Sequence, residues 1–467
     1  MTSLAEERAE QARWNVRARY AGYDVFDRLV ENEFTPPELI AAEEAEALRT
    51  VLDFAVAEVP HYRSLFARLG LAARDIRDRR DLPRLPVLSK HELREGFESL
   101  KPDRLPEGVE IWGVMKTSGS TGPPTRVVSS KENNLMFSIL NQRQTRWFRR
   151  DPTGTLAYIR LPGSFPQPRP GEWLANGETF RMPGWRYLNA FFETGPGIAF
   201  SVLNPEAEQI AWLRRERPDY LVTRSHTLEH LALAAPGERP CASLQAMTAI
   251  SEAITPATCR HLESIFGAPV QQAYGLNEIG LVATLCEAGR YHVHREHCLV
   301  EIVDEAGWPC RAGAAGRLLL TGLNNFAMPL LRYDSNDLVT AVDGPCPCGR
   351  TLPSFGEIHG RYSRIQPLPA GTLGRVATLR TALQTMPLEL VRQLRRYQIH
   401  QLRDGGFELH LVAAGTLPPA FCERLQNVWS SVTAGPPLVL REVEDIPLDT
   451  AVDKFDDFVS AYYEERG

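Results

Sequence analysis

Residues 117–125 read Thr-Ser-Gly-Ser-Thr-Gly-Pro-Pro-Thr, and this stretch indicates more about fold and function than any other part of the chain. Five of these nine residues carry hydroxyls and two are glycines. Hydroxyls donate hydrogen bonds, and glycine lets backbone N–H groups converge on an anion. Apolar runs at 111–115 and 127–128 flank the stretch, so we expect a phosphate-binding loop between two strands, unlike the Gly-Lys-Ser/Thr loop that opens a helix. A flexible Ser/Gly hairpin is the alternative interpretation.

The composition is that of a globular, enzyme-sized chain. Its 467 residues exceed one ordinary core, so two or more domains are expected. The 43% hydrophobic and 24% charged residues are typical of globular proteins. A total of 52 Lys and Arg against 58 Asp and Glu gives a net charge of −6. This balance argues against nucleic acid as the main partner, because binding to a phosphate backbone requires a basic surface.

The sequence also indicates in which cellular compartment the protein is expected. We find no apolar run of membrane-spanning length, so no membrane partner is expected. The first residues, MTSLAEERAEQARW, are acidic and lack the apolar core of a signal peptide. Eight cysteines in a chain this long are typical of a reducing compartment, where thiols stay free or bind metal. We therefore expect a cytoplasmic protein.

The order of the predicted elements indicates an α/β fold with two domains. The part from 1 to about 110 is interpreted as largely helical, because apolar residues recur at helical spacing over 48–59. Residues 111–360 alternate short apolar strands with helices, the pattern of an α/β sheet. We expect strands at 156–160, 220–223, 247–250, 270–273, 299–303 and 317–321, and helices at 228–235 and 256–266. From residue 361 the pattern is that of a small α+β unit, so we expect a large domain over 1–360 and a small one over 361–467.

Four further segments carry candidate site residues. Tyr274 follows a predicted strand and suits stacking on a base, and the carboxylate of Glu278 suits Mg²⁺. Asp337 is expected to end a strand, where its two acceptor oxygens fit the two hydroxyls of a ribose. Arg361 stands where the composition changes and suits a phosphate or ribose contact, and Lys454 suits a phosphoryl group on a mobile loop. Each segment alone also fits an ordinary turn or a solvated surface.

Two closely spaced pairs of metal-ligand residues are present, Cys286 with His292 and Cys346 with Cys348. Brought together, they suit a tetrahedral structural Zn²⁺, because four protein ligands leave no open position for catalysis. The choice of histidine stays open, because three further candidates lie close by: His294, which shares a predicted strand face with His292, and also His297 and Cys298. Buried thiols and surface histidines without metal are the alternative.

Taken together, in this order and spacing, these segments resemble the adenylate-forming superfamily of acyl- and aryl-CoA ligases, and within it the phenylacetate-CoA ligase and CapK-like branch. The resemblance covers nearly the whole chain. It rests on AEVPHYR at 57–63, LPVLSK at 85–90, TSGSTG at 117–122, YGLNE at 274–278, TGLNNFAMPLLRY at 321–333 and CPCGR at 346–350. The loop and the CPCGR run are the most specific of these motifs.

The resemblance implies an enzyme that carries out a two-step ligation. A small carboxylate, expected to be aromatic, attacks the α-phosphate of ATP to give acyl-AMP and pyrophosphate. A thiol, usually that of coenzyme A, then takes the acyl group. The first step demands the neutralisation and in-line placement of two anions. The implied fold is a large N-terminal adenylation domain with a small mobile C-terminal domain.

The resemblance also implies a role for each matched residue. The β- and γ-phosphates of ATP are assigned to the loop residues Thr117, Ser118, Gly119, Ser120, Thr121 and Gly122. The adenine side is assigned to Ser251, Glu252 and Ala253, which also border the acyl pocket, and to Tyr274, which would stack on the base. Gly275 and Asn277 are further nucleotide-binding positions, and the amide of Asn277, where the family usually has Thr or Ser, can donate to a phosphate. The other assignments are Mg²⁺ for Glu278, the ribose hydroxyls for Asp337, the ribose–phosphate side for Arg361, and a bridge between carboxylate and α-phosphate for Lys454. In related sequences of this branch a Cys–His pair likewise precedes a CxC pair, which places the expected zinc within 286–348.

Some positions depart from the family pattern and leave alternatives open. Asp334 adds negative charge near the nucleotide, and Asn336 stands where glycine is usual but tolerates a left-handed turn. Residues 361–364 lack the acids usual after Gly-Arg, and Asp453 replaces the glycine before Lys454. The alternatives are an adenylating enzyme whose acceptor is an amine or a carrier-protein thiol, and a nucleotide-binding scaffold that has lost catalysis. A carrier protein and a second copy of the chain, as a homodimer, are therefore considered as partners beside the carboxylate.

The acyl pocket is the part that the sequence determines least. Residues 164–197 combine several aromatic side chains with many glycines and prolines. They either line a pocket for an aromatic acid or pack as ordinary core. Arg224 and His226, after the strand at Tyr220, are candidate neighbours of the carboxylate.

Overall fold

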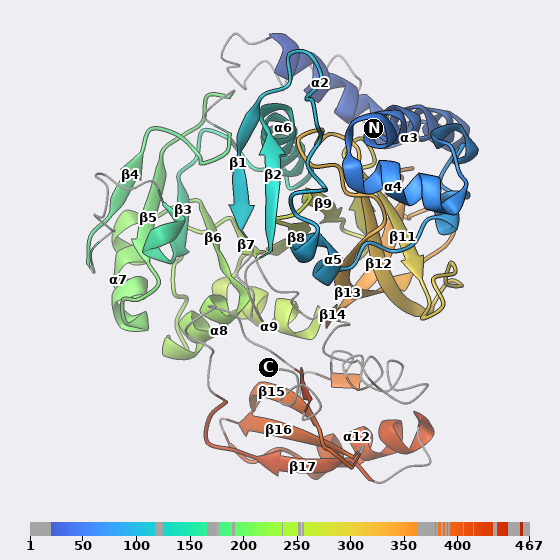
Figure 1. Ribbon diagram of the computed structural model, residues 1–467. Helices are drawn as coiled ribbons and strands as arrows, with labels where there is room; N and C mark the ends of the chain where they lie inside the picture. Colours follow the sequence, from blue (N-terminus) through green and yellow to red (C-terminus); the bar gives the residue numbers. More distant parts are fainter. Residues whose placement is uncertain are drawn as a thin grey trace.

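The computed structural model shows a large α/β body and a small α+β unit at the C-terminal end of the chain (Figure 1). It describes residues 20–116, 125–165, 175, 177–188, 192–235, 237–250, 254, 256–361, 379, 382–383, 386–387, 390, 393–404, 406–413, 415–432, 437–446 and 458–460. Within these ranges, no helix is both long and apolar enough to cross a bilayer.

A twelve-stranded mixed sheet forms the centre of the large body, in the order β11-β12-β13-β14-β10-β9-β8-β7-β6-β3-β5-β4. Its parallel strands are β3 (Leu156–Arg160), β5 (Gly197–Ser201), β6 (Tyr220–Arg224), β7 (Ala246–Ile250) and β8 (Val270–Leu276). Its antiparallel strands are β4 (Phe180–Met182), β9 (Gly280–Leu285), β10 (Tyr291–Val293), β11 (Cys298–Val303), β12 (Ala315–Gly322), β13 (Tyr333–Ala341) and β14 (Ser354–Arg361). The two parts join at the β8–β9 hairpin.

Helices cover both faces of the parallel part. On one face, α7 (Glu206–Glu216), α8 (Ser225–Ala234) and α9 (Pro256–Phe266) pack apolar side chains against alternate strand residues such as Ala157 and Leu221. On the other face, α6 (Lys131–Trp147) and α2 (Tyr20–Glu31) share an apolar cluster with Leu281 of β9. The helix over 256–266 agrees with the prediction, since Pro256 opens it and Gly267, at φ 69°, follows it.

Three N-terminal helices pack against the antiparallel part (Figure 1). They are α3 (Pro37–Glu58), α4 (Pro60–Leu69) and α5 (Lys90–Glu95), and the 3₁₀ turn of Asn32–Phe34 follows α2. The apolar stripe over 48–59 faces the core as predicted, with Leu48 and Val51 buried. Ser89 caps α5 in a capping box with Glu92, so Lys90 becomes the first residue of this helix.

The predicted strand–loop–strand is present. The strands β1 (Ile111–Lys116) and β2 (Arg126–Ser130) pair antiparallel as a separate two-stranded sheet. The loop residues 117–124 lie outside the described residues, so only the two ends of the loop are placed.

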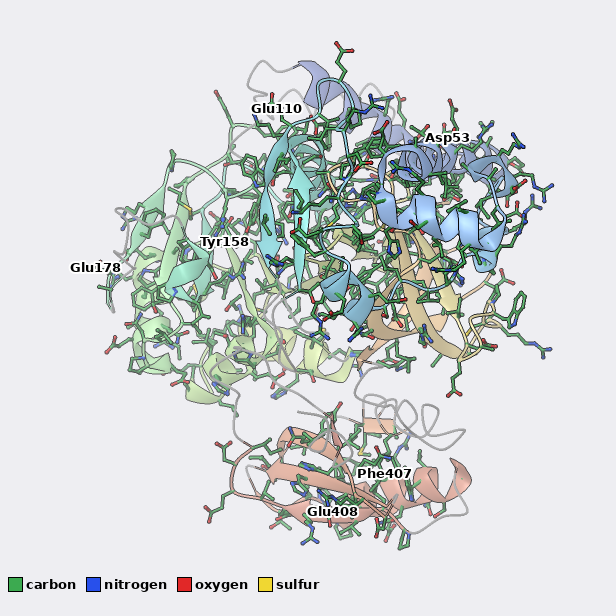
Figure 2. All side chains as sticks on the ribbon, in the orientation of Figure 1. Asp53, Glu110, Tyr158, Glu178, Phe407 and Glu408 are labelled. Carbon is green, nitrogen blue, oxygen red and sulfur yellow. The ribbon has the colours of Figure 1, made fainter. Side chains whose placement is uncertain are left out.

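The small C-terminal unit has a four-stranded sheet in the order β17-β16-β15-β18. Its elements are β15 (Leu394–Gln401), β16 (Phe407–Ala413), α12 (Pro419–Val432), β17 (Val439–Glu442) and β18 (Phe458–Ser460). Phe407 belongs to the apolar face shared with α12, whereas the next residue, Glu408, forms ion pairs on the other face (Figure 2). The division of the chain at residue 361 stays a prediction, although β14 ends there.

Two expectations about strand ends need correction. Asp337 does not end a strand, because β13 continues to Ala341, paired with β12 and β14. Tyr274 does not follow its strand, because β8 runs on to Leu276 as one side of the β8–β9 hairpin. Both differences have one cause: pairing with a neighbouring strand extends each element beyond its predicted end.

Candidate active site

The β8–β9 hairpin and β13 bring two predicted nucleotide residues into contact. The hydroxyl of Tyr274 donates a hydrogen bond to the carboxylate of Asp337 at 2.6 Å. Burial, reinforced by that carboxylate, raises the pKa of Tyr274 well above its usual value, so the hydroxyl stays a donor. Residues 63 positions apart in the sequence thus form one polar unit at the centre of the sheet.

Glu278 lies in the turn of this hairpin and is buried, with 6% of its surface exposed. Its Oε1 accepts a hydrogen bond from the hydroxyl of Tyr333 at 2.8 Å, and the ammonium of Lys90 lies 3.6 Å from the same oxygen. The hydroxyl and the nearby ammonium orient the Glu278 carboxylate, as the neighbours of a metal-binding carboxylate do.

Lys90 and Tyr333 are site residues that the sequence analysis missed. Both stood inside quoted motifs, Lys90 at the end of LPVLSK and Tyr333 at the end of the 321–333 stretch, but neither was given a role. The sequence feature that could have indicated Lys90 is the Ser89 cap, which makes Lys90 the first residue of α5. Its proximity to Glu278 depends on the docking of α5 against β13, which no local pattern reveals.

The strand that carries Asp337 is locally irregular. Asn336 adopts a left-handed conformation at φ 61°, as its predicted tolerance for such a turn allows. Asp337 pairs across the sheet with Arg361, the last residue of β14, so these two predicted residues are register partners.

The expectation that Asp334 places free negative charge near the nucleotide was wrong. Arg317, on the neighbouring strand β12, lies 3.0 Å from the Asp334 carboxylate, and both side chains are largely buried. The backbone N–H of Asn336 also donates to Asp334 at 2.9 Å. The charge is therefore neutralised within the sheet, and Asp334 supports the bend beside Asp337.

Two buried side chains support the hairpin and its neighbours. Gln272 accepts hydrogen bonds at its Oε1 from the N–H of Ile254 and from the hydroxyl of Tyr291, each at 3.2 Å. Ile254 follows the predicted adenine loop, so Gln272 fixes the exit of that loop. His297 Nε2 lies 2.8 Å from the carbonyl of Ile279, directly after Glu278.

Several predicted site residues lie outside the described residues. These are the phosphate loop Thr117, Ser118, Gly119, Ser120, Thr121 and Gly122, the adenine loop Ser251, Glu252 and Ala253, and Lys454. For Arg361 only the backbone pairing is described. Gly275 and Asn277 are placed with the β8–β9 hairpin.

The four predicted zinc ligands come together beside the antiparallel part of the sheet. The ligand atoms of Cys286, His292, Cys346 and Cys348 all lie within 4.8 Å of one another. The Cys286 and Cys346 sulfurs are 3.7 Å apart, far beyond a disulfide bond, and Cys348 Sγ lies 3.2 Å from His292 Nε2. Two sulfurs bound tetrahedrally to one Zn²⁺ at ~2.3 Å would be about 3.8 Å apart, so the donor set and its spacing fit this ion.

The structure selects His292 from the candidate histidines. The carbonyl of Leu352 lies 3.1 Å from His292 Nδ1, which leaves Nε2 directed at the thiols. Burial lowers the pKa of His292 to about 4, and a neutral imidazole is the form that binds metal. His294 instead contacts Thr284, and His297 supports the hairpin, so neither belongs to the cluster.

Residues next to the cluster also bind the turn at 32–34 that follows α2. Arg350, two residues after Cys348, forms an ion pair at 3.2 Å with Glu33, whose side chain is fully buried. Thr351 N–H donates to the carbonyl of the same Glu33 at 2.9 Å. Arg143 of α6 reaches the other Glu33 oxygen at 3.4 Å. The ordering of the 346–351 loop and of the 32–34 turn is therefore coupled.

Most described aromatic residues of 164–197 pack as core. Trp185 is buried and donates its indole N–H to the carbonyl of Gly154 at 2.9 Å. Phe165 packs beside Tyr158 of β3, and Phe192 packs beside Phe26 of α2. Trp173 and Phe191 lie outside the described residues. For Trp185, Phe165 and Phe192 the core interpretation is therefore the appropriate one.

Comparisons with known proteins agree with this geometry. A sequence model of the family described as AMP-binding enzyme matches residues 36–328. The chain is 27% identical over 419 residues to the phenylacetate-coenzyme A ligase of Thermus thermophilus, covering 86% of each chain. It is 26% identical over 351 residues to that of Escherichia coli, covering 71% of this chain and 75% of the other. The crystal structure of 2-hydroxyisobutyryl-CoA ligase with R3-HIB-AMP superposes with a TM-score of 0.69 at 19% identity, covering 93% of this chain and 92% of that one.

The fold and the polar hairpin define an α/β enzyme of the adenylate-forming type, as the resemblance implied. The family match spans more than half of the chain, and this chain therefore belongs to the AMP-binding enzyme family. Its similarity to phenylacetate-CoA ligases over most of its length confirms the predicted branch.

Proposed function

We propose that this protein is an ATP-dependent, AMP-forming acid–thiol ligase. It activates a small carboxylic acid as acyl-AMP and transfers the acyl group to coenzyme A. Family membership and the similarity to named CoA ligases support the proposal. The observation that carries it is the contact of Tyr274 with Asp337 next to the buried Glu278, because this cluster unites three separately predicted nucleotide residues.

Three described residues carry the proposed roles for the ribose and for Mg²⁺ in the first half-reaction. Asp337 presents carboxylate oxygens for the two ribose hydroxyls, and Tyr274 holds that carboxylate in place. Glu278 would hold Mg²⁺ together with phosphate oxygens, since Mg²⁺ in nucleotide sites is bound by one or two carboxylates plus substrate phosphates. When bound, the ion neutralises phosphate charge. Lys90 adds positive charge beside Glu278.

The remaining assignments are part of the same proposal. Residues 117–122 cradle the β- and γ-phosphates, 251–253 border the adenine, and Arg361 contacts the ribose–phosphate side. Lys454 bridges the carboxylate and the α-phosphate during adenylation. Three observations support these assignments. The strands β1 and β2 flank the phosphate loop, Gln272 accepts a hydrogen bond from Ile254 at the end of the adenine loop, and Asp337 pairs with Arg361.

We further propose that Cys286, His292, Cys346 and Cys348 bind a structural Zn²⁺. The sulfur separation of 3.7 Å and the orientation of His292 support this assignment. The ion would complete four protein ligands and so hold the 346–351 loop against Glu33, with no open coordination position for catalysis.

The test is ATP–pyrophosphate exchange with a panel of carboxylic acids, followed by assay of thioester formation with coenzyme A. We expect acid-dependent exchange without coenzyme A, and AMP plus thioester when coenzyme A is added. Exchange followed by transfer to an amine or a carrier-protein thiol, with no coenzyme A thioester, would show that this group and not coenzyme A is the acceptor. Tight nucleotide binding without any exchange would instead identify a scaffold that has lost catalysis.

A further inference from the structure

A buried histidine, His297, contacts the backbone of the turn that carries Glu278. This turn connects the paired residues Leu276 and Gly280 of β8 and β9, and the N–H of Ile279 donates to the carbonyl of Leu276 at 3.2 Å. The carbonyl of Ile279 lies 2.8 Å from His297 Nε2, and only 1% of the surface of His297 is exposed. The peptide directly after Glu278 is therefore held from outside the hairpin.

The hydrogen bonds around the His297 ring define which nitrogen carries the proton. A carbonyl only accepts hydrogen bonds, so Nε2 must donate to Ile279. Burial lowers the pKa of His297 to about 4, so the ring is neutral and its Nδ1 is an acceptor. The side-chain nitrogen of Asn324 lies 3.4 Å from Nδ1 and 2.7 Å from the carbonyl of Glu296, two acceptors that match its two N–H bonds. Asn324 therefore favours the form of His297 that can hold the turn.

The turn approaches His297 more closely than a side chain at position 280 would allow. Gly280 has φ 110°, and a Cβ at this position would lie 3.0 Å from His297 Nε2. Any other residue would be strained in this backbone conformation and would also push against the donor nitrogen. The glycine and the histidine are thus matched parts of one contact.

Glu278 is consequently held at both ends. Its carboxylate accepts a hydrogen bond from Tyr333 at 2.8 Å, whereas the peptide that follows its backbone is held by His297. A carboxylate that binds Mg²⁺ has to be presented in one direction, because this ion demands near-ideal octahedral geometry. The two contacts are complementary: Tyr333 orients the carboxylate, and His297 fixes the backbone from which the side chain starts.

Resting on the proposed function, we propose that His297 is a positioning residue for the Mg²⁺ ligand Glu278, and that Asn324 sets its tautomer. His297 acts through the peptide after Glu278 rather than by contact with the nucleotide. The carboxylate then keeps one direction before and after Mg²⁺ binds. This role also accounts for a buried histidine that the sequence placed among the candidates for zinc.

The first test reads the tautomer in the protein without nucleotide. Nitrogen-15 NMR of histidine-labelled protein, with the His297 signals identified by their loss in His297→Gln, should show a proton on Nε2 and none on Nδ1. Asn324→Asp replaces the donor at Nδ1 by an acceptor, so this variant should place a proton on Nδ1. A proton on Nδ1 in the wild-type protein, or a bare Nδ1 in Asn324→Asp, would overturn the inference.

The second test is the Mg²⁺ dependence of ATP–pyrophosphate exchange. His297→Leu loses the donor and Gly280→Ala pushes against it, so each should raise the Mg²⁺ concentration for half-maximal exchange about 3- to 10-fold, the range for one hydrogen bond. The KM for the acid should stay the same. His297→Gln should restore part of the effect, because its amide keeps an N–H donor. The matched control is Gly307→Ala, since Gly307 has φ 85° but a Cβ there would meet no described atom within 4 Å.

The outcomes separate this inference from the proposed function. An unchanged Mg²⁺ requirement overturns the inference, and so does an equal rise in the KM for the acid, because His297 would then only support the hairpin. If His297→Leu does not fold, Gly280→Ala and His297→Gln decide the question. Exchange with no acid overturns the proposed function. Mn²⁺ binding to the protein with ATP, measured by electron paramagnetic resonance, then tests the inference: Gly280→Ala should weaken it, and equal binding would overturn the role of His297.

Discussion

The site around the β8–β9 hairpin (Tyr274, Glu278, Tyr333 and Asp337) and the Cys–His cluster lie in the same sheet. Their polar groups nevertheless find partners in different ways. At the hairpin, Tyr274 donates to Asp337 and Tyr333 donates to Glu278, so protein groups already hold one another. In the cluster, the ligand atoms of three thiols and an imidazole all lie within 4.8 Å of one another, and thiols form only weak hydrogen bonds. The comparison teaches that the protein's own groups already hold one another at the hairpin, whereas the Cys–His cluster has the arrangement that the proposed Zn²⁺ would complete.

Loss of zinc should have the largest effect. Cys346→Ser, or chelation of the purified protein, should lower the free energy of unfolding by several kcal/mol, because metal binding is coupled to folding. Metal analysis and thermal unfolding check this, with Cys422→Ser on α12 as the matched control. Protein that contains no zinc, or that loses it without a change in melting temperature, would show that the cluster is held by packing alone.

Glu278→Gln should lower the rate of acyl-AMP formation by about 100-fold or more, since an electrostatic contact to the transition state is lost. The Mg²⁺ concentration needed for half-maximal exchange should rise as well. Glu305→Gln, at an exposed turn, is the control. An unchanged Mg²⁺ dependence would remove Glu278 from the metal-binding role even if the rate falls.

Tyr333→Phe tests whether Tyr333 orients the Glu278 carboxylate. The variant keeps the buried ring and loses only the hydroxyl that orients Glu278. A hydrogen bond to a charged group contributes about 1.5–3 kcal/mol, so we expect a loss of about 10- to 100-fold in kcat. A rate equal to that of the wild type would mean that Glu278 is positioned without Tyr333.

Tyr274→Phe should have a smaller effect that falls mainly on nucleotide binding. The ring remains, but Asp337 loses the donor that fixes it. We expect the KM for ATP to rise about tenfold with little change in kcat. A change confined to kcat would contradict the assignment of Asp337 to the ribose.

A pH effect on stability should be the smallest. Burial lowers the pKa of His297 to about 4, so the unfolded chain takes up a proton near pH 6.5 that the folded chain does not. Stability is therefore full above pH 6.5 and falls as the pH drops toward 4, by less than about 1 kcal/mol between pH 7 and pH 6. Urea titrations at several pH values, with His297→Gln as comparison, measure it. An identical pH slope in the variant would exclude His297 as the source.

The sequence predicted the regular parts of the fold well, because local apolar periodicity determines them. The strand at 156–160 and the helix at 256–266 were placed correctly to the residue. The short strand β9 was not predicted, since its existence depends on pairing with β8 and β10. Contacts across the sheet explain the other differences: Arg317 neutralises Asp334, and partner strands extend β13 past Asp337.

The sequence predicted those residues of the candidate site whose side-chain chemistry and motif together indicate a role. Tyr274, Glu278 and Asp337 were identified from their motifs, and the structure places them around one hairpin. Lys90 was missed because its contact with Glu278 depends on the docking of α5 against β13.

The pairing of Asp337 with Arg361 has a mechanical consequence. Arg361 is the final residue of β14, and everything that follows in the chain is attached to the sheet through it. A torque on the chain beyond this point would act first on the strand that carries Asp337, the residue proposed to bind the ribose. The register of β13 against β12 shifts between Arg317 and Leu319, and the left-handed Asn336 lies among the additional residues of β13, so that strand is irregular next to Asp337. The residue proposed to bind the ribose and the last residue of β14 are therefore linked directly through one backbone pair.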